Sequence, residues 1–433
     1  MSTPQKTVWI VNHYATNAQR DGRSGRHDQL ASHLAQHGWH SVVVAASTDH
    51  PSGRQTFRRF RLRERWSGPH HEFLWLRGVG YDGNGALRVL DILSFTVLLL
   101  PPGSTRRLPR PDVVVGSSVH PLAAWAAGVV ARRLGVPFIY EPRDLWPESL
   151  IQYGAIAAES VVARLLRHIE RRTVSMAGLV VSPLRGAGRY YAERGLPRPF
   201  LWVSNGVTPA PAHDVVDTGT SDGARRDDDR FEIAYLGSMG QANALDPVLE
   251  AFETAAGRPG GERLVLRMVG TGPARAELQR RAAGGRHADR VVFDGHVPQS
   301  RAREIGRAAD CLVVNLHPID LYRHGTSLNK FFEYLMLGKP IVVGTSVDDD
   351  VVTDAGAGIK VAGSDVEGLA AAMLTMAATP AARLAEMGGR GRAHVLRHYR
   401  YAVLAERLAE GLDAARLGRT SELGRVETSE LQS

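Results

Sequence analysis

The chain has 433 residues, of which 43% are hydrophobic and 23% are charged. This length exceeds one ordinary domain, and the composition is that of a globular protein, which excludes collagen-like and largely disordered chains. The one cysteine, Cys311, lies in an apolar run, which excludes a disulfide framework and fits a reducing compartment.

No segment has the pattern of a secretory signal or of a membrane-spanning helix. The N-terminal sequence passes directly into a strand pattern without the apolar region of a signal peptide. The longest apolar run, residues 92–102, is about half of the roughly 20 residues that a spanning helix needs. We therefore expect a soluble, cytoplasmic protein.

The formal net charge of +8 has two interpretations. Basic residues gather locally at residues 54–65, 106–110 and 164–172, and a solvated surface explains such clusters as well as a functional patch does. As a patch, they suit an anionic membrane surface or a phosphate-bearing substrate better than nucleic acid. We expect no nucleic acid partner, and peripheral contact with the inner face of a membrane stays open.

Apolar strand patterns alternate with helical patterns along the chain, which is typical of doubly wound α/β sheets. Residues 208–229 are rich in Pro, Asp, Gly and Ser, which predicts a linker between two such domains. Two comparable domains joined by a hinge place a ligand in the cleft between them. The expected strands are residues 7–12, 41–46, 112–117, 137–141, 179–182, 231–236, 263–269, 290–293, 311–315 and 341–344, with a helix at residues 26–37.

The run Gly270-Thr271-Gly272-Pro273 follows a predicted strand and opens a helix, with Asp294 at the end of the next strand. This arrangement is similar to a dinucleotide fingerprint and raises the alternative of a dehydrogenase. Arg275 occupies the third glycine position, however, and the unit is not the first of its domain. A strand-to-helix turn of small residues is the preferred interpretation, and it still presents a helix N-terminus to the ligand.

The most informative segment is residues 324–343, HGTSLNKFFEYLMLGKPIVV. A small, flexible loop at 325–327 precedes a predicted helix at 329–337, and backbone N–H groups of such a loop can approach phosphate oxygens. Lys330 adds a positive charge in the first turn, and Glu333 lies on the same helix face, where it can accept bonds from ribose hydroxyls. A solvated lysine–glutamate pair is the alternative for this segment taken alone.

This segment resembles the donor-site motif of retaining glycosyltransferases of family 4, which have the GT-B fold of two Rossmann-like domains facing across a cleft. The block YEPRDLWPESLIQYGAI is similar to that of the fucosamine-transferase-like bacterial subgroup, and other similarities extend to about residue 399. The positions that match the family's donor motif are Gly325, Ser327, Lys330, Glu333, Tyr334, Gly338, Lys339 and Pro340.

The resemblance implies a domain arrangement and donor-site residues. It implies an acceptor-side domain at 1–207, a linker at 208–230 and a nucleotide-sugar domain at 231–395. It further implies a helix at 396–417 that packs back on the first domain, and a disordered tail at 418–433. The donor-site residues implied are Gly25 and Arg26 near the diphosphate from the first domain, Ser238, Asn243, Gly272, Gly325, Thr326, Ser327, Asn329 and Lys330 around the phosphates, Glu333 at the ribose, and backbone near His296 and Val297 at the base.

On the sugar side, the resemblance implies that His120 faces the transferred sugar and that Asp144, next to Arg143, is an acceptor-side carboxylate. With Lys330, His120 and Asp144 are the expected catalytic residues. Three features depart from the family. Gly325 stands where a glutamate commonly binds sugar hydroxyls, and the usual lysine after the glycine–serine loop of the second domain is absent at residues 241–245. Leu328 replaces a proline of the subgroup. The expected substitutes for the missing sugar contacts are His317, Asp320 or Arg323.

The function implied is transfer of a hexosyl or N-acetylhexosaminyl group from a UDP- or GDP-linked sugar, with retention of configuration and without a metal or other cofactor. Two acceptors stay open, a lipid-linked saccharide and a small secondary-metabolite precursor. A nucleotide-sugar epimerase and a non-catalytic nucleotide-sugar-binding protein of the same fold are the alternatives in function.

Overall fold

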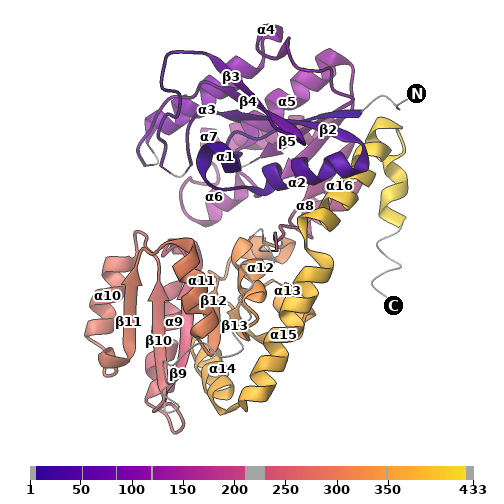
Figure 1. The fold of residues 1–433 in the computed structure, drawn as a ribbon. Coiled ribbons are helices and arrows are strands. Elements are labelled where there is room, and N and C mark those ends of the chain that lie inside the picture. The colour runs from indigo at the N-terminus through magenta and orange to yellow at the C-terminus, as the bar shows by residue number, and fades with distance from the viewer. Residues whose placement is uncertain are drawn as a thin grey trace. The chain divides into compact units, whose positions relative to one another are not determined.

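A computed structural model describes residues 6–50, 52–83, 85–118, 120–209, 230–326, 328–347 and 350–425. The chain forms two compact units (Figure 1). The first unit comprises Met1–Asn205, His324–Ser327 and Tyr401–Ser433, and the second comprises Gly206–Arg323 and Leu328–Arg400. Most of the predicted linker, residues 210–229, lies outside the described residues.

The first unit is built on an eight-stranded sheet with the strand order β3-β4-β2-β1-β5-β6-β7-β8. All neighbouring strands run parallel except the antiparallel pair β3–β4. The strands are β1 (Lys6–Val11), β2 (Trp39–Ala46), β3 (Arg63–Ser67), β4 (His71–Leu76), β5 (Val113–Ser118), β6 (Phe138–Pro142), β7 (Leu179–Ser182) and β8 (Phe200–Trp202).

Helices cover both faces of this sheet, as a buried parallel sheet requires. The apolar sides of α2 (Arg26–Leu34) and α16 (Tyr401–Arg416) share one core with the sheet, through residues such as Leu30 and Leu408. Figure 1 shows these two helices side by side although they lie at opposite ends of the chain. The other helices of the unit are α1 (Ala18–Asp21), α3 (Ala86–Leu99), α4 (Pro102–Thr105), α5 (Pro121–Leu134), α6 (Glu148–Gln152), α7 (Val161–Met176) and α8 (Ala187–Glu193).

The second unit has a six-stranded, wholly parallel sheet with the order β11-β10-β9-β12-β13-β14. Its strands are β9 (Phe231–Leu236), β10 (Leu264–Val269), β11 (Val291–Gly295), β12 (Cys311–Asn315), β13 (Ile341–Gly344) and β14 (Gly358–Val361). The helices are α9 (Leu245–Ala256), α10 (Arg275–Ala283), α11 (Gln299–Ala308), α12 (Asn329–Met336), α13 (Val351–Asp354), α14 (Val366–Ala378) and α15 (Ala381–His398).

The two doubly wound α/β units confirm the predicted fold class, and every strand expected from the sequence is present to within two residues at either end. The sequence missed β3, β4, β8 and β14. The basic run at 54–65, interpreted as a solvated loop, in part forms the edge strand β3, whose alternating exposed positions hide its strand character. Residues 420–425, assigned to a disordered tail, form a 3₁₀ helix.

Among the described residues, no single helix is long and apolar enough to cross a bilayer. Only the consecutive helices α14 and α15, taken together across a bend of 114°, reach the length and composition of a span.

Gly270 is one of the positions where the second unit has no room for a side chain. Its φ is 133°, and a Cβ placed there would lie 1.9 Å from the carbonyl oxygen of Gly237. We expect Gly270→Ala to lower the free energy of unfolding by about 3 kcal/mol or more, since backbone strain and overpacking each cost about 1–3 kcal/mol. Denaturant titration of the full chain measures this.

The matched control is Gly260→Ala, because Gly260 also has a positive φ, 86°, but a Cβ there meets nothing within 4 Å. It carries only the backbone strain, about 1 kcal/mol. Equal losses in the two variants would contradict the close packing of the loops that contain Gly237 and Gly270.

Candidate functional site

Three neighbouring strands of the second unit end at the same edge of the sheet. Ser238 follows β9, Gly272 follows β10 and Val297 follows β11, and these strands are adjacent and parallel. The carboxyl edge of an open parallel sheet is where α/β proteins bind ligands. The structure therefore brings these three predicted donor-binding positions to one edge.

Backbone hydrogen bonds fix the loops of this edge to one another. The N–H of Met239 donates to the carbonyl of Thr271 over 2.9 Å, and the N–H of Gly270 donates to the carbonyl of Gly295 over 2.7 Å. Gly272 fits because a Cβ there would lie 2.5 Å from the carbonyl oxygen of Met239. The run Gly270–Gly272 is thus a close-packed strand-to-helix turn, as the preferred interpretation of its sequence held.

Lys330 lies in the first turn of α12 and reaches back to the end of β9. Its ammonium group donates to Asn243 Oδ1 over 2.7 Å and to the hydroxyl of Tyr235, and Nζ lies 4.2 Å from the centroid of the Tyr235 ring. The side chain passes directly over Gly237, where a Cβ would stand 2.4 Å from Lys330 Cε. A glycine at 237 is therefore a condition for the position of this lysine.

No carboxylate of the described residues forms an ion pair with the Lys330 ammonium group. Burial lowers the pKa of Lys330 to about 7, and the nearby charge of Glu333 opposes this shift. The helix N-terminus beside it adds the partial positive charge of unpaired N–H groups, with no side-chain cap at Leu328. The second unit thus concentrates positive potential at this edge without a matching anion from its own chain.

Asn243 holds its place through its own hydrogen bond, from Nδ2 to the carbonyl of Ser238 over 2.9 Å. This confirms that Ser238, Asn243 and Lys330 lie together. Ser238 contributes its backbone carbonyl to this network, and its side chain is exposed. Asn329 and Glu333, on the same helix as Lys330, are also exposed, and Glu333 forms neither a hydrogen bond nor an ion pair with the described residues.

Two tyrosines of this site were missing from the predicted site residues. The hydroxyl of Tyr334 bonds both backbone groups of Leu236, accepting from its N–H over 2.6 Å and donating to its carbonyl over 2.9 Å. This anchors α12 to the last residue of β9. Tyr235 carries the Lys330 ammonium group. The i, i+4 spacing of Lys330 and Tyr334 is the sequence signal that both side chains share a helix face.

In the first unit, Arg26 is committed to internal contacts. Its side chain is only 3% exposed; Nε donates to Glu141 Oε1 over 3.0 Å, and the other guanidinium nitrogens donate to the carbonyls of Val203 and Ser204. His27 bonds the other Glu141 oxygen over 2.6 Å. These contacts differ from those of a side chain that binds phosphate. Gly25, directly before, caps the N-terminus of α2 with its backbone.

The Arg26 guanidinium and the hydrogen bond from His27 hold the pKa of the Glu141 carboxyl far below its usual range, although burial alone would raise it. Because an ionised carboxylate in the core is stable only with such partners, Arg26 is a structural counter-ion in this arrangement. Asn12 Nδ2 donates to His27 Nδ1 over 2.9 Å, which adds the residue after β1 to this network. The network of Arg26, His27 and Glu141 with Asn12 fixes the end of β1 to the start of α2.

His120 caps α5 at the carboxyl end of β5, and its environment is unusual. The side chain is buried at 2% exposure, yet both ring nitrogens are without a hydrogen-bond partner among the described residues. Burial and the proximity of His13 and Arg88 lower the pKa of His120 well below its ordinary value, so the ring is neutral. Buried polar atoms are nearly always bonded, so this imidazole is set up for a ligand.

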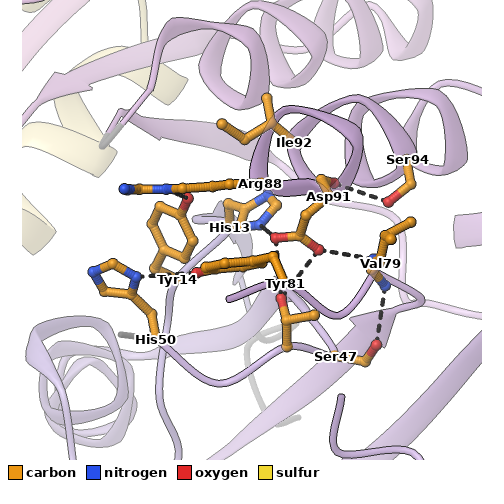
Figure 2. Close-up of polar contacts among 12 residues, drawn as sticks. His13, Tyr14, Ser47, His50, Val79, Tyr81, Arg88, Asp91, Ile92 and Ser94 are labelled. Atoms are coloured by element: carbon orange, nitrogen blue, oxygen red, sulfur yellow. Dashed lines mark hydrogen bonds and ion pairs between the residues drawn. The ribbon is translucent and has the colours of Figure 1, made fainter. Parts of the chain in front are cut away.

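Beside His120 lies a polar cluster that sequence reasoning missed, shown in Figure 2. His13 follows β1, and its Nε2 contacts Asp91 Oδ2 on α3 at 2.7 Å. Asp91 also accepts from the N–H of Val79 over 2.9 Å and from the Thr48 hydroxyl. These donors assign the acceptor role to Asp91, so the His13 ring donates from Nε2. The rings of His13 and His120 meet edge to face at 4.9 Å.

Two further rings, those of Tyr14 and His50, extend this cluster. Tyr14 lies against His50 with ring centroids 4.4 Å apart, and Arg88 Nε donates to the Tyr14 hydroxyl over 3.2 Å. Burial and the nearby arginines lower the pKa of His50 to about 4, so this ring is neutral at physiological pH. Half-buried aromatic and neutral imidazole rings of this kind suit the faces and hydroxyls of a sugar.

The other predicted residues fall in different places. Asp144 is exposed after β6 and accepts from the N–H of Leu145 over 2.9 Å. Gly325 and Thr326 group with the first unit, where a Cβ on Gly325 would lie 3.1 Å from Arg185 N, and Ser327 lies outside the described residues. His317, Asp320 and Arg323 are exposed in the second unit between β12 and this loop.

Two family models match the chain, and together they span most of it. Residues 26–206 match the glycosyl transferase 4-like domain, and residues 230–379 match glycosyl transferases group 1. Both units thus match glycosyltransferase family models, and the two doubly wound α/β units are those of the GT-B fold. The division between the two matches follows the division into two α/β units.

Known proteins with this architecture are distant in sequence. A probable glycosyltransferase, WbjE from Pseudomonas aeruginosa, is 22% identical over 266 residues, which are 60% of this chain and 62% of that relative's length. The sucrose-phosphate synthase from Thermosynechococcus elongatus has a TM-score of 0.66 at 16% identity, covering 94% of this chain and 98% of that one. HepE from Anabaena, solved with UDP and glucose, has a TM-score of 0.60 at 14% identity, covering 94% and 100%.

The internal pairing of Arg26 predicts the phenotype of its removal. We expect Arg26→Met to lower the free energy of unfolding by about 3–5 kcal/mol, because Glu141 would lose a buried counter-ion. Arg23→Met is the matched control, since Arg23 is 46% exposed in its pair with Asp49, and exposed pairs contribute about 0–1 kcal/mol. Denaturant unfolding of both variants decides the matter. An Arg26 variant of unchanged stability but with weakened nucleotide binding would instead assign the side chain to the ligand.

Proposed function

We propose that this glycosyltransferase moves a sugar from a UDP- or GDP-linked donor to an acceptor with retention of the anomeric configuration. The observation that carries the proposal is the ammonium group of Lys330, half-buried beside a helix N-terminus and without a carboxylate ion pair among the described residues. A diphosphate supplies the missing negative charge. The solved structures of the same fold include complexes with UDP-glucose and with UDP-2-fluoro glucose, which supports a nucleotide sugar as the donor.

In this proposal each group has a separate task. Lys330 and the N–H groups at the start of α12 hold the diphosphate, backbone near Val297 meets the base, and the exposed carboxylate of Glu333 accepts bonds from the ribose hydroxyls. His120, with its unbonded ring nitrogens, faces the transferred sugar. Asp144 is assigned to the acceptor side.

The reaction breaks the bond between the anomeric carbon and the β-phosphate oxygen, and the acceptor oxygen bonds the same face of that carbon. The acceptor proton passes to the departing phosphate oxygen. Negative charge grows on this phosphate as it leaves, so fixed positive groups there stabilise the transition state more than the ground state. This chemistry needs no metal, and we propose none.

The first test is substitution of the lysine. We expect Lys330→Met, which keeps the length and loses the charge, to lower turnover about 10²–10³-fold, as removal of one transition-state donor does. Lys330→Arg keeps the charge and should retain more activity than the Met variant. The assay follows nucleotide release from UDP- and GDP-sugars with and without acceptor extract. Wild-type turnover in Lys330→Met would remove Lys330 from the mechanism.

The same assay separates the alternatives in function. A nucleotide-sugar epimerase would convert the donor without any acceptor, and a binding protein would bind the donor and release no nucleotide. For the acceptor we propose a lipid-linked saccharide, as the fucosamine-transferase-like resemblance implies, or a small secondary-metabolite precursor. Mass spectrometry of the products formed in a cell extract distinguishes these two acceptors.

The second test uses pH. Free Lys330 has a pKa of about 7, and a bound diphosphate raises it, because the anion favours the charged form. Below pH 7 Lys330 is already charged in the free protein, so its contribution to the affinity for a nucleoside diphosphate should not change with pH. It should fall as the pH rises above 7, by up to about tenfold per pH unit, since each pKa unit corresponds to about 1.4 kcal/mol.

Calorimetric titration with UDP and GDP between about pH 7.5 and 8.5 measures this slope, because the phosphates do not titrate there. Lys330→Arg is the control, since a guanidinium stays charged throughout and should abolish the slope. Proton uptake on binding, seen by comparing two buffers, should likewise disappear in the Arg variant. A wild-type affinity that is flat over this range would contradict the proposed contact.

A further inference from the structure

Helix α3 of the first unit presents two different faces. The inner face carries residues spaced at helical intervals: Arg88, Asp91, Phe95 and Leu99. On this face Arg88 bonds Tyr14 and Asp91 bonds His13 (Figure 2). The opposite side is aliphatic and open to solvent. This α3 face consists of Leu87, Val89, Leu90, Leu93 and Val97, which are 42–62% exposed.

Such a face is uncommon on a monomeric globular protein, where large apolar residues at the surface are usually scattered singly. The helix carries only two charged side chains, Arg88 and Asp91, and the structure turns both inward. Its outer side is therefore uncharged over 14 residues, about 21 Å. That length is too short to span a bilayer and suits a helix that lies along an interface.

A basic loop adjoins the C-terminal end of this helix. The segment at residues 58–63, a loop that ends on the first residue of β3, reads Arg-Arg-Phe-Arg-Leu-Arg and is exposed throughout, with Phe60 at 81% and Leu62 at 54%. Arg63 donates to the carbonyls of Gly103 and Ser104 on α4, which directly follows α3. The aliphatic helix face and the loop are therefore joined within one unit.

Four arginines of this region have no counter-ion. Arg58, Arg59, Arg106 and Arg107 are exposed, and none forms an ion pair with a described residue. The acidic side chain closest in sequence to Arg58 and Arg59 is Glu64, which pairs with Arg61. The one closest to Arg106 and Arg107 is Asp112, which accepts a hydrogen bond from the N–H of Thr7. Exposed aliphatic and aromatic side chains beside unpaired arginines are the chemistry of a surface that binds anionic lipid.

We propose that the α3 face and these four arginines dock the chain on an anionic membrane surface. The aliphatic side chains enter the headgroup region, and the arginines contact lipid phosphates. A two-fold dimer through the same face is disfavoured, because it would bring two sets of unpaired arginines together. The proposal goes beyond glycosyl transfer and depends on no residue of the Lys330 site.

Docking through α3 has a structural consequence for the first unit. The inner side of the same helix holds His13 and Tyr14 through Asp91 and Arg88. The polar cluster around His13 and His120 thus lies one helix thickness from the proposed membrane contact. A molecule anchored in that membrane would meet this cluster without leaving the surface.

Co-sedimentation of the full chain with vesicles tests the proposal. The chain should bind phosphatidylcholine vesicles containing about one third phosphatidylglycerol, bind pure phosphatidylcholine weakly, and release on raising the salt concentration. Val89→Glu with Val97→Glu places two carboxylates on the α3 face and should weaken binding at least about tenfold. Replacing Arg58, Arg59, Arg106 and Arg107 by Gln should remove the preference for anionic vesicles.

The charge-matched control is Val292→Glu with Leu417→Glu, at exposed aliphatic positions on β11 and after α16, and it should bind as the wild type does. UDP affinity, measured in parallel, should be unchanged in every variant, so a failure here is distinct from a failure of the proposed function. Absence of wild-type binding to anionic vesicles overturns the proposal. So does equal loss in the control, or a wild-type dimer in light scattering that only the α3 variants dissociate.

Discussion

The approach of Lys330 to the end of β9 is the constraint on which the candidate donor site depends. It requires a residue without a side chain at 237, since a Cβ there would stand 2.4 Å from Lys330 Cε. The loop of Gly237 is in turn covered by Gly270, which must also lack a side chain. Tyr334 then fixes the helix that carries the lysine to Leu236. Two glycines and one tyrosine thus set the position of a single positive charge.

Burial of Lys330 lowers the stability of the folded protein in the absence of a ligand. Burial lowers the pKa of Lys330 to about 7, so the folded chain holds this proton less firmly than the unfolded chain, whose lysine keeps its ordinary value of 10.5. Because the unfolded state binds more protons between these two values, this group favours unfolding below pH 7, and stability rises with pH up to about 10.5. An electrostatic cost of this kind is common where a charged group is positioned for a ligand.

The sequence predicted the fold and the second-unit site better than it predicted the first-unit contacts. The strands and the glycine turn follow from local patterns, and the common helix face of Lys330 and Glu333 follows from helix spacing, so a single helix carries that information. Arg26 was assigned to the diphosphate from the family resemblance, and nothing local could reveal its partner Glu141, 115 positions away. Separation in sequence also hid the pairing of His13 with Asp91, which joins a loop to a helix 78 positions later.

The buried polar groups of this chain divide according to whether the chain itself satisfies them. Glu141 accepts from the Arg26 guanidinium and from the His27 ring, and Asp91 accepts from a histidine, a hydroxyl and a backbone N–H. Both carboxylates are complete without a ligand and position other residues. His120 has two unbonded nitrogens, and Lys330 has hydrogen bonds but no counter-ion. Unsatisfied buried groups of this kind are costly to folding and are candidates for ligand contact. Under the proposed function, His120 and Lys330 are such candidates, while the Arg26 side chain is occupied by contacts within its own unit.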